Sequence, residues 1–302
     1  MRALGELPPQ QQVKILRKQG CIDEAKEIEI ALAIGGARAL RIGSVAKLLG
    51  GQTHMWQNTK HVFGFVPITP PGNKQLDIIH PGNMKANQSL KNKRITVRLD
   101  SLRIADYPGK GEHHILFDFL VKNYVGRQSE SVRFNQTYRG QEGQSVGIIG
   151  YPVFIGLGVG NVGISLECST INAYNKKDRA LIKFLDSDVF KNGLQLTTTL
   201  QPAIAPMAGM ATNLVKMMAK RNENAPVQTF HMGLDFAGGP GGARLSEGLY
   251  FAIQIPDKEL AVWDWNEWVY DQRNGRVVKR ADSKTLIPYN FISFKMFKYT
   301  GD

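Results

Sequence analysis

Three observations predict that this chain of 302 residues is a mainly β protein built on an antiparallel β-sandwich, with an N-terminal helical element and one inserted helix. From about residue 60 onward, short apolar runs follow one another. Val162, Ile164, Leu166 and Cys168 alternate with Gly163, Ser165, Glu167 and Ser169 at a period of two. Asn274-Gly275 separates two such runs and is typical of a two-residue hairpin. Strands do not alternate with helices, which argues against a parallel sheet.

The expected strands are separated by short connections rich in Gly, Asn and Pro. They cover residues 61–68, 94–104, 114–124, 132–138, 162–173, 194–200, 227–236, 249–255, 261–270, 277–279 and 290–299. Such a strand-rich body with polar loops resembles C2-like and jelly-roll-like β-sandwich modules. That resemblance concerns architecture alone and implies no activity.

The first 50 residues favour helices. Pro9 suits a first helical position and Gly20 a helix end, while Asp23 is a good start for a second helix. Gly35-Gly36 is expected to weaken or bend that second helix. We therefore divide the chain into a helical element, residues 1–59, and a β-sandwich domain, residues 60–302, with the inserted helix near residues 206–221.

Positive charge is concentrated early in the chain. Residues 30–99 hold 10 of the 38 Lys and Arg but one acid, Asp77, which leaves +9 of the net +12 in this window. The remaining 232 residues carry +3, from 28 basic and 25 acidic residues. Folding rarely requires such an imbalance, so we expect a surface that meets an anionic partner.

The residues expected to bind that partner follow from the same window. Residues 34–51 combine apolar and basic side chains without acids, as in an interfacial amphipathic helix. The expected membrane contacts are Ile34, Leu40 and Leu48. The expected contacts to the anionic surface are Arg38, Arg41, Lys47, Lys60, Lys91, Lys93, Arg94 and Arg98.

The leading hypothesis is a non-enzymatic binding or effector protein that engages an anionic surface, foremost a membrane. Self-association and insertion as an oligomer are its extension. The alternative is a nucleic-acid-binding or particle-forming, coat-like protein, with Trp56, Phe63 and Phe65 as stacking residues. An acidic protein is a third class of partner. We expect no cofactor and no metal site.

Two motifs suggest chemistry that their context does not favour. Gly143-Gln144-Ser145-Val146-Gly147 fits the pattern of a hydrolase nucleophile elbow, so a serine hydrolase that uses Ser145 is a second alternative. The residues that follow favour a strand, whereas the elbow requires a helix. Residues 158–163 match G-x-G-x-x-G, yet they precede the alternating strand and therefore favour a turn.

Two further features concern aromatic and sulfur-containing residues. Trp263, Trp265 and Trp268 lie close together in sequence, and the pattern leaves open whether they form core or a binding platform. Cys21 and Cys168 are the two cysteines, which favours a reducing compartment. The polar start of the chain resembles no signal peptide, so the expected localisation is cytoplasmic with peripheral attachment to a membrane.

Overall fold

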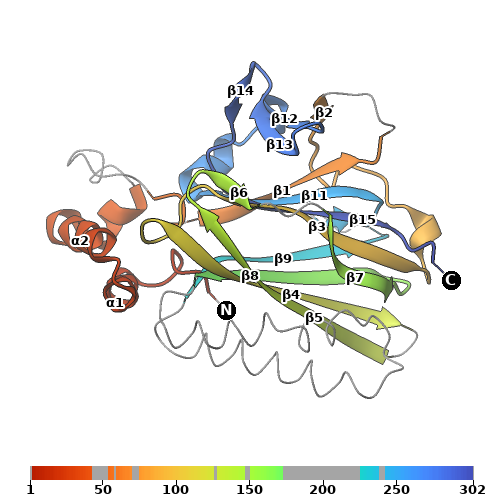
Figure 1. Cartoon of the computed structure of the whole chain (residues 1–302), viewed down its shortest axis with the longest axis horizontal. Helices are drawn as coiled ribbons and strands as arrows, with labels where there is room; N and C mark the ends of the chain where they lie inside the picture. Colours follow the sequence, from red (N-terminus) through yellow and green to blue (C-terminus); the bar gives the residue numbers. More distant parts are fainter. Residues whose placement is uncertain are drawn as a thin grey trace.

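The computed structural model describes residues 2–42, 54–57, 59–69, 75–125, 128–146, 150–172, 225–237 and 242–301. Two large sheets face each other as a β-sandwich, a smaller sheet lies on the outside of one of them, and two helices lie at one end (Figure 1). The prediction of a mainly β sandwich with an N-terminal helical element is confirmed. The expected helix near residues 206–221 and strand at 194–200 lie outside the described residues.

The first large sheet has the strand order β1-β11-β15-β3-β6, and β7 also pairs with β3. All of its pairs are antiparallel. The strands are β1 (Thr59–Pro67), β3 (Arg94–Ile104), β6 (Gln144–Val146), β7 (Tyr151–Gly158), β11 (Gly248–Pro256) and β15 (Asn290–Lys298).

The second large sheet has the order β10-β9-β8-β4-β5 and is antiparallel except for the β10–β9 pair. Its strands are β4 (Glu112–Val125), β5 (Gln128–Gln141), β8 (Gly163–Asn172), β9 (Pro226–Asp235) and β10 (Ala243–Arg244). The alternation in β8 buries Ile164, Leu166 and Cys168, as a strand with one face on the core requires.

Aromatic side chains join the two large sheets. The Phe119 ring of β4 lies 5.9 Å from Phe154 of β7 and 5.5 Å from Phe294 of β15, measured between ring centroids. At the other side of the core, Phe63 of β1 meets Phe230 of β9 edge to face at 5.9 Å. These contacts fill the space between the sheets with apolar rings.

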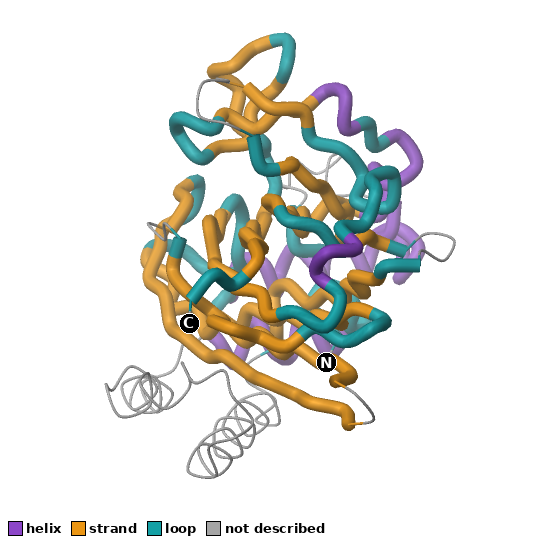
Figure 2. Tube along the Cα trace, turned by 90° about the vertical axis from the view of Figure 1, so that its right-hand side faces the viewer, coloured by secondary structure: helices purple, strands orange, loops and turns teal. Residues whose placement is uncertain are grey.

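The third sheet, ordered β14-β13-β12-β2, lies on the outer face of the first sheet, above the sandwich in Figure 2. Its strands are β2 (Gln75–Asp77), β12 (Trp268–Asp271), β13 (Arg276–Lys279) and β14 (Asp282–Leu286). The predicted hairpin joins β12 to β13, but residues 272–275 connect the strands, so the loop has four residues rather than the predicted two. Gly275 has φ +61°, which suits glycine in this turn.

The tryptophan cluster differs from the predicted strand at 261–270. Two 3₁₀ turns, η2 (Asp257–Val262) and η3 (Trp265–Glu267), occupy the first part of this segment, and β12 begins only at Trp268. The Asp264 carboxylate accepts the Asn266 N–H and starts the second turn. Trp268 is buried, whereas Trp263 and Trp265 are half-buried against the core under the third sheet. The cluster is thus mainly packing.

The helical element consists of α1 (Pro9–Gln19) and α2 (Ile22–Ile42). Pro9 begins α1 and Gly20 caps it at φ +81°, as the sequence predicts. The Gly35-Gly36 pair does not end α2, because each glycine costs only about 1 kcal/mol in a helix. Buried residues of both helices and of the link between them share the core of the two large sheets: Val13 and Leu16 of α1, Cys21 of the link, and Ala25 and Ile28 of α2.

Candidate functional site

The cations expected to form one surface lie at opposite ends of the first sheet. Lys60, near the start of β1, pairs with Ile255 at the end of β11, and this end also contains Arg103, near the end of β3. Arg94 begins β3, nine residues from Arg103. At about 3.3 Å per strand residue, the two ends are about 30 Å apart. The expected single patch is therefore not formed.

The predicted residues of the helical element are described only in part. Ile34 is 58% exposed on α2. Arg38, Leu40 and Arg41 lie in the last turns of the same helix, where the structure describes the backbone but not the side chains. Lys47 and Leu48 lie outside the described residues. The strand order, which local sequence patterns do not encode, places the helical element far from the cations at the start of β3.

Five exposed cations gather at the end of the sandwich opposite the helices, the end that Figure 2 faces. We call this surface the cationic end, and it consists of Lys91, Lys93, Arg94, Arg98 and Lys298. The sequence predicted four of them, and strand β15 adds Lys298, which pairs with Ile95 beside Arg94. Within the described ranges, none of the five forms an ion pair.

Aromatic rings hold two of these cations in place. Lys91 Nζ lies 5.3 Å from the centroid of the Phe236 ring, and Arg98 Cζ lies 5.1 Å from that of Phe297. Cation–π contacts of this kind orient the charged end of a side chain without neutralising its charge. Glu247 also lies at this end, but its carboxylate accepts the Lys298 backbone N–H at 2.8 Å and the Asn87 amide at 3.1 Å.

An exposed aliphatic side chain, Val162, lies at the same end of the sandwich, in a turn that is hydrogen-bonded to Lys93. It is 66% exposed and belongs to the turn between β7 and β8. Backbone hydrogen bonds from Val159 to Lys93 and from Phe236 to Val162 fix this turn beside the cations. The strand predicted from residue 162 is found as β8, which begins one residue later, at Gly163. The prediction of a turn at residues 158–163 is confirmed.

A pocket of about 240 Å³, which we call the arginine pocket, lies at the other end of β3. It opens between β3, β6 and the third sheet, which adjoin one another in Figure 1. Its lining combines two arginines, small polar residues and an apolar floor: Arg103, Arg276, Gly143, Gln144, Ser145, Val277, Leu286 and Phe291. Sequence analysis had missed both arginines, because Arg103 and Arg276 are 173 positions apart and meet only through the fold.

Ser145 lines this pocket without the surroundings of a nucleophile elbow. It pairs with Arg103 from the short edge strand β6, and the next described element is strand β7. No histidine or carboxylate is present among the residues that line the pocket. Nothing in this lining can act as a general base toward the Ser145 hydroxyl.

A second pocket of about 210 Å³ lies between the third sheet and the outer face of the first. Its walls are mostly apolar, including Leu249 and Phe297. At its edge, Lys295 Nζ lies 2.8 Å from Asp100 Oδ1, and the Tyr270 hydroxyl donates to Asp100 Oδ2 at 3.3 Å. The Asp100 carboxylate thus neutralises the cation of this pocket, which distinguishes it from the arginine pocket.

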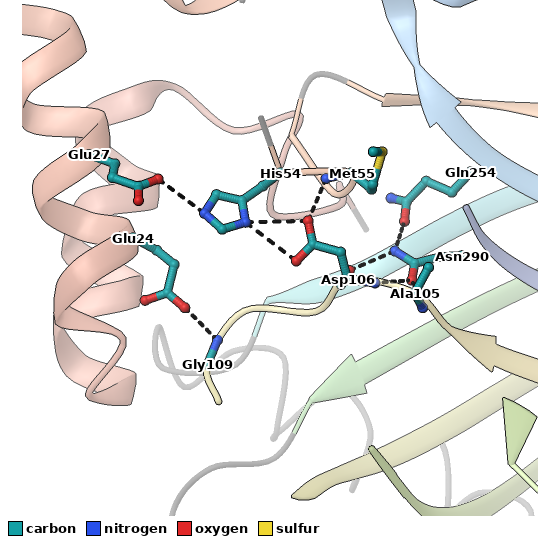
Figure 3. Close-up of polar contacts among 9 residues, drawn as sticks. All are labelled: Glu24, Glu27, His54, Met55, Ala105, Asp106, Gly109, Gln254 and Asn290. Atoms are coloured by element: carbon teal, nitrogen blue, oxygen red, sulfur yellow. Dashed lines mark hydrogen bonds and ion pairs between the residues drawn. The ribbon is translucent and has the colours of Figure 1, made fainter. Parts of the chain in front are cut away.

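A polar network joins the helical element to the sandwich (Figure 3). His54 Nε2 lies 3.2 Å from Glu27 Oε2 of α2, and the Asp106 carboxylate accepts the Met55 N–H at 2.6 Å. Burial lowers the pKa of His54, but the hydrogen bond to Asp106 and the charges of Asp106, Glu27 and Glu24 outweigh burial and raise that pKa above its ordinary value.

The network continues into the core through Asn290. The Asn290 Oδ1 accepts the N–H groups of Ala105 and Asp106, and its Nδ2 donates to Gln254 Oε1 at 2.9 Å. Glu24 on α2 accepts the Gly109 N–H at 2.9 Å. Because every contact holds backbone or a neighbouring side chain, we assign this network a structural role.

The comparisons add no family to this geometry. No protein-family model matches the chain, and neither a curated protein nor a solved structure is significantly similar to it. Among the described residues, no three His, Cys, Asp or Glu side chains gather closely enough to hold a metal ion. None of the helices in the described ranges is both long and apolar enough to cross a bilayer.

Proposed function

We propose that this chain is a non-enzymatic binding protein that attaches to an anionic membrane surface through its cationic end. One observation carries the proposal: five exposed cations without ion pairs in the described structure lie at the same end of the sandwich as the exposed aliphatic side chain of Val162. The proposal keeps the class of function predicted from the sequence but moves the contact surface away from the helical element.

The energy of such a contact is sufficient for reversible attachment. Each basic group near an anionic bilayer contributes about 1 kcal/mol, so the five together contribute about 5 kcal/mol. Burial of Val162 among the acyl chains adds about 1.5 kcal/mol at most. Because most of this energy is electrostatic, the attachment weakens as salt is added.

A lipid surface fits these residues better than a polynucleotide does. Trp56 and Phe65, two of the stacking residues expected for nucleic acid, are 0% and 2% exposed, and Phe63 is half-buried in the core. Stacking on bases requires an exposed ring. An exposed valine at the same end as the cations instead matches the interface between head groups and acyl chains.

The opposite end carries charges of both signs. Helix α2 has Asp23, Glu24, Glu27 and Glu29 close to its start, and Glu29 and Asp23 form ion pairs with Arg17 and Lys110. Mixed charges attract an anionic bilayer less than the cationic end does, because its five cations form no ion pairs in the described structure. Self-association, insertion as an oligomer and an acidic protein partner stay predictions.

Co-sedimentation with vesicles tests the proposal. Vesicles of phosphatidylserine and phosphatidylcholine should bind the protein at low salt, and pure phosphatidylcholine should not. Replacement of Lys91, Lys93 and Arg94 by Gln should weaken binding by about 100-fold, at about 1 kcal/mol for each charge. The matched control replaces Lys14, Lys18 and Lys26, which are exposed on the helices, and should change binding little.

Three results would count against the proposal. Equal losses in the two triple variants would show that net charge, rather than the cationic end, governs binding. Binding that does not require phosphatidylserine would remove the electrostatic basis. A polynucleotide that shifts in a mobility assay while anionic vesicles fail to bind would favour the nucleic-acid alternative.

A further inference from the structure

The arginine pocket contains a guanidinium that the fold holds rigidly. Arg103 is only 9% exposed. Its Nε donates to the Ile287 carbonyl at 3.0 Å, and its Nη1 donates to the Gly143 carbonyl, also at 3.0 Å. These two bonds orient the guanidinium plane, while Nη2 has no hydrogen-bond partner among the described residues. A group fixed in this way is pre-organised to donate to a ligand.

A second guanidinium faces the same space. Arg276 of β13 lines the pocket from the third sheet. Burial and the positive charge of Arg276 both lower the pKa of Arg103. Two like charges around one cavity repel each other, and an anion between them would remove that repulsion.

Carboxylates do not neutralise this pair. Neither arginine forms an ion pair with any residue that the structure describes, and the lining contains no Asp or Glu. Asp271 lies opposite Arg276 in the β12–β13 pair, but its oxygens accept the Arg273 N–H and the Asn274 side-chain amide. The pocket is therefore cationic without an internal counterion.

The remaining lining residues define the rest of a ligand. Ser145 and Gln144 add a hydroxyl and an amide that can donate hydrogen bonds, and Phe291, Val277 and Leu286 add apolar surface. The volume of about 240 Å³ lies below the range of about 300–1,000 Å³ usual for drug-sized ligands. The pocket thus accommodates one anionic group with a small apolar attachment.

We propose that the arginine pocket binds the phosphate of a small phosphomonoester, with the ester group against Phe291, Val277 and Leu286. A phosphomonoester carries a charge of about −1.5 to −2 at neutral pH, which matches two guanidinium groups better than a single carboxylate does. The ester can belong to a soluble metabolite or to a lipid head group. This site is separate from the cationic end, and neither proposal depends on the other.

Titration calorimetry and thermal unfolding test the site at constant ionic strength. The probes are inorganic phosphate, phenyl phosphate and, as an uncharged control, phenol. Both phosphates should bind and raise the unfolding temperature, since a ligand that binds only the folded state stabilises it. Phenyl phosphate should bind about tenfold more tightly than inorganic phosphate, because its ring buries apolar surface. Phenol should have no effect.

The test replaces Arg276 rather than Arg103. Arg103 donates hydrogen bonds to two backbone carbonyl groups, so its replacement would destabilise the fold. Arg276→Gln should weaken phosphate binding by about 10- to 100-fold, as expected for one charge-assisted hydrogen bond. The same variant should unfold at a slightly higher temperature than the parent protein without phosphate, because the repulsion is gone. The matched control is Arg273→Gln, which removes an exposed charge from the same hairpin outside the pocket.

The outcomes separate the proposal from its alternatives. The proposal would be overturned if neither inorganic phosphate nor phenyl phosphate bound at concentrations up to about 10 mM, a range that detects millimolar dissociation constants. Equal losses in Arg276→Gln and Arg273→Gln would also overturn it. Tighter binding of a short-chain phosphatidic acid than of glycerol 3-phosphate would support the lipid source, and the reverse order the soluble source.

Discussion

His54 and Asp106 form a bidentate contact in which the imidazole Nδ1 lies 3.3 Å from each carboxylate oxygen (Figure 3). His54 precedes β1, and Asp106 follows β3, so the contact links two distant parts of the chain. Glu27 completes the arrangement from α2. The position of the helical element on the sandwich therefore depends in part on the charge of one histidine.

This charge predicts a pH dependence of stability. The pKa of His54 in the folded protein is above the ordinary value of about 6.5, so the protonated imidazole stabilises the fold fully below that value. The contribution is lost as the pH rises through the folded pKa. His54→Gln should lower the free energy of unfolding by about 1.5–3 kcal/mol near pH 6 and by less near pH 9.

Urea unfolding of both proteins across this range measures the difference. Arg17→Gln provides the control, because the exposed Arg17–Glu29 ion pair keeps its charges across this range, so its loss should not change the pH profile. A difference between the parent protein and His54→Gln that stays constant from pH 6 to pH 9 would contradict the charged contact.

His61 predicts an effect of opposite sign. Burial lowers its pKa to about 4, although a hydrogen bond with Gln228 raises it in part. Below about pH 6.5 the unfolded chain binds a proton at this residue that the folded protein does not, so His61 by itself lowers the stability by about 2 kcal/mol between pH 8 and pH 5. His61→Phe should remove this part of the acid destabilisation. Unfolding curves at both pH values check the prediction, and an unchanged loss in the variant would refute it.

Gly64 lets Trp265 pack directly on strand β1. A Cβ atom at Gly64 would lie 2.7 Å from Trp265 Cη2 and 2.6 Å from Ile78 Cγ2. Gly64→Ala should therefore destabilise the protein by about 1–3 kcal/mol through overpacking. Gly233→Ala on β9 is the control, since an added Cβ there meets nothing within 4 Å. Thermal unfolding of the two variants decides the point, and equal stabilities would argue against close packing.

Local patterns predicted most strands because the apolar and polar residues along a strand reflect which of its side chains are buried. The expected strand at 94–104 coincides with β3, and a hairpin containing Asn274-Gly275 occurs where expected, although four residues rather than two connect its strands. The expected strand at 261–270 failed in its first half. Trp265 packs from a 3₁₀ turn and Trp263 from the link before it, and aromatic content alone does not distinguish such turns from a strand.

The candidate site was less predictable than the fold. The cluster of Lys91, Lys93, Arg94 and Arg98 lies within eight positions and was visible in the sequence. Its separation from Lys60 follows from the β1-β11-β15-β3 order, a non-local property. Arg103 and Arg276 line one pocket only because of this strand order and the position of the third sheet. No local sequence pattern could therefore predict the pocket.

Site-directed fluorescence shows most directly which end of the molecule meets a membrane. Cys21 and Cys168 are 3% and 0% exposed, so an introduced surface cysteine can be labelled selectively. The two matched positions are Val162 at the cationic end and Ile34 on α2, both exposed aliphatic residues. With phosphatidylserine vesicles, an environment-sensitive dye on Val162→Cys should shift to shorter wavelength, whereas the same dye on Ile34→Cys should not. A shift at residue 34 without one at residue 162 would contradict the account and return the contact to the helical element.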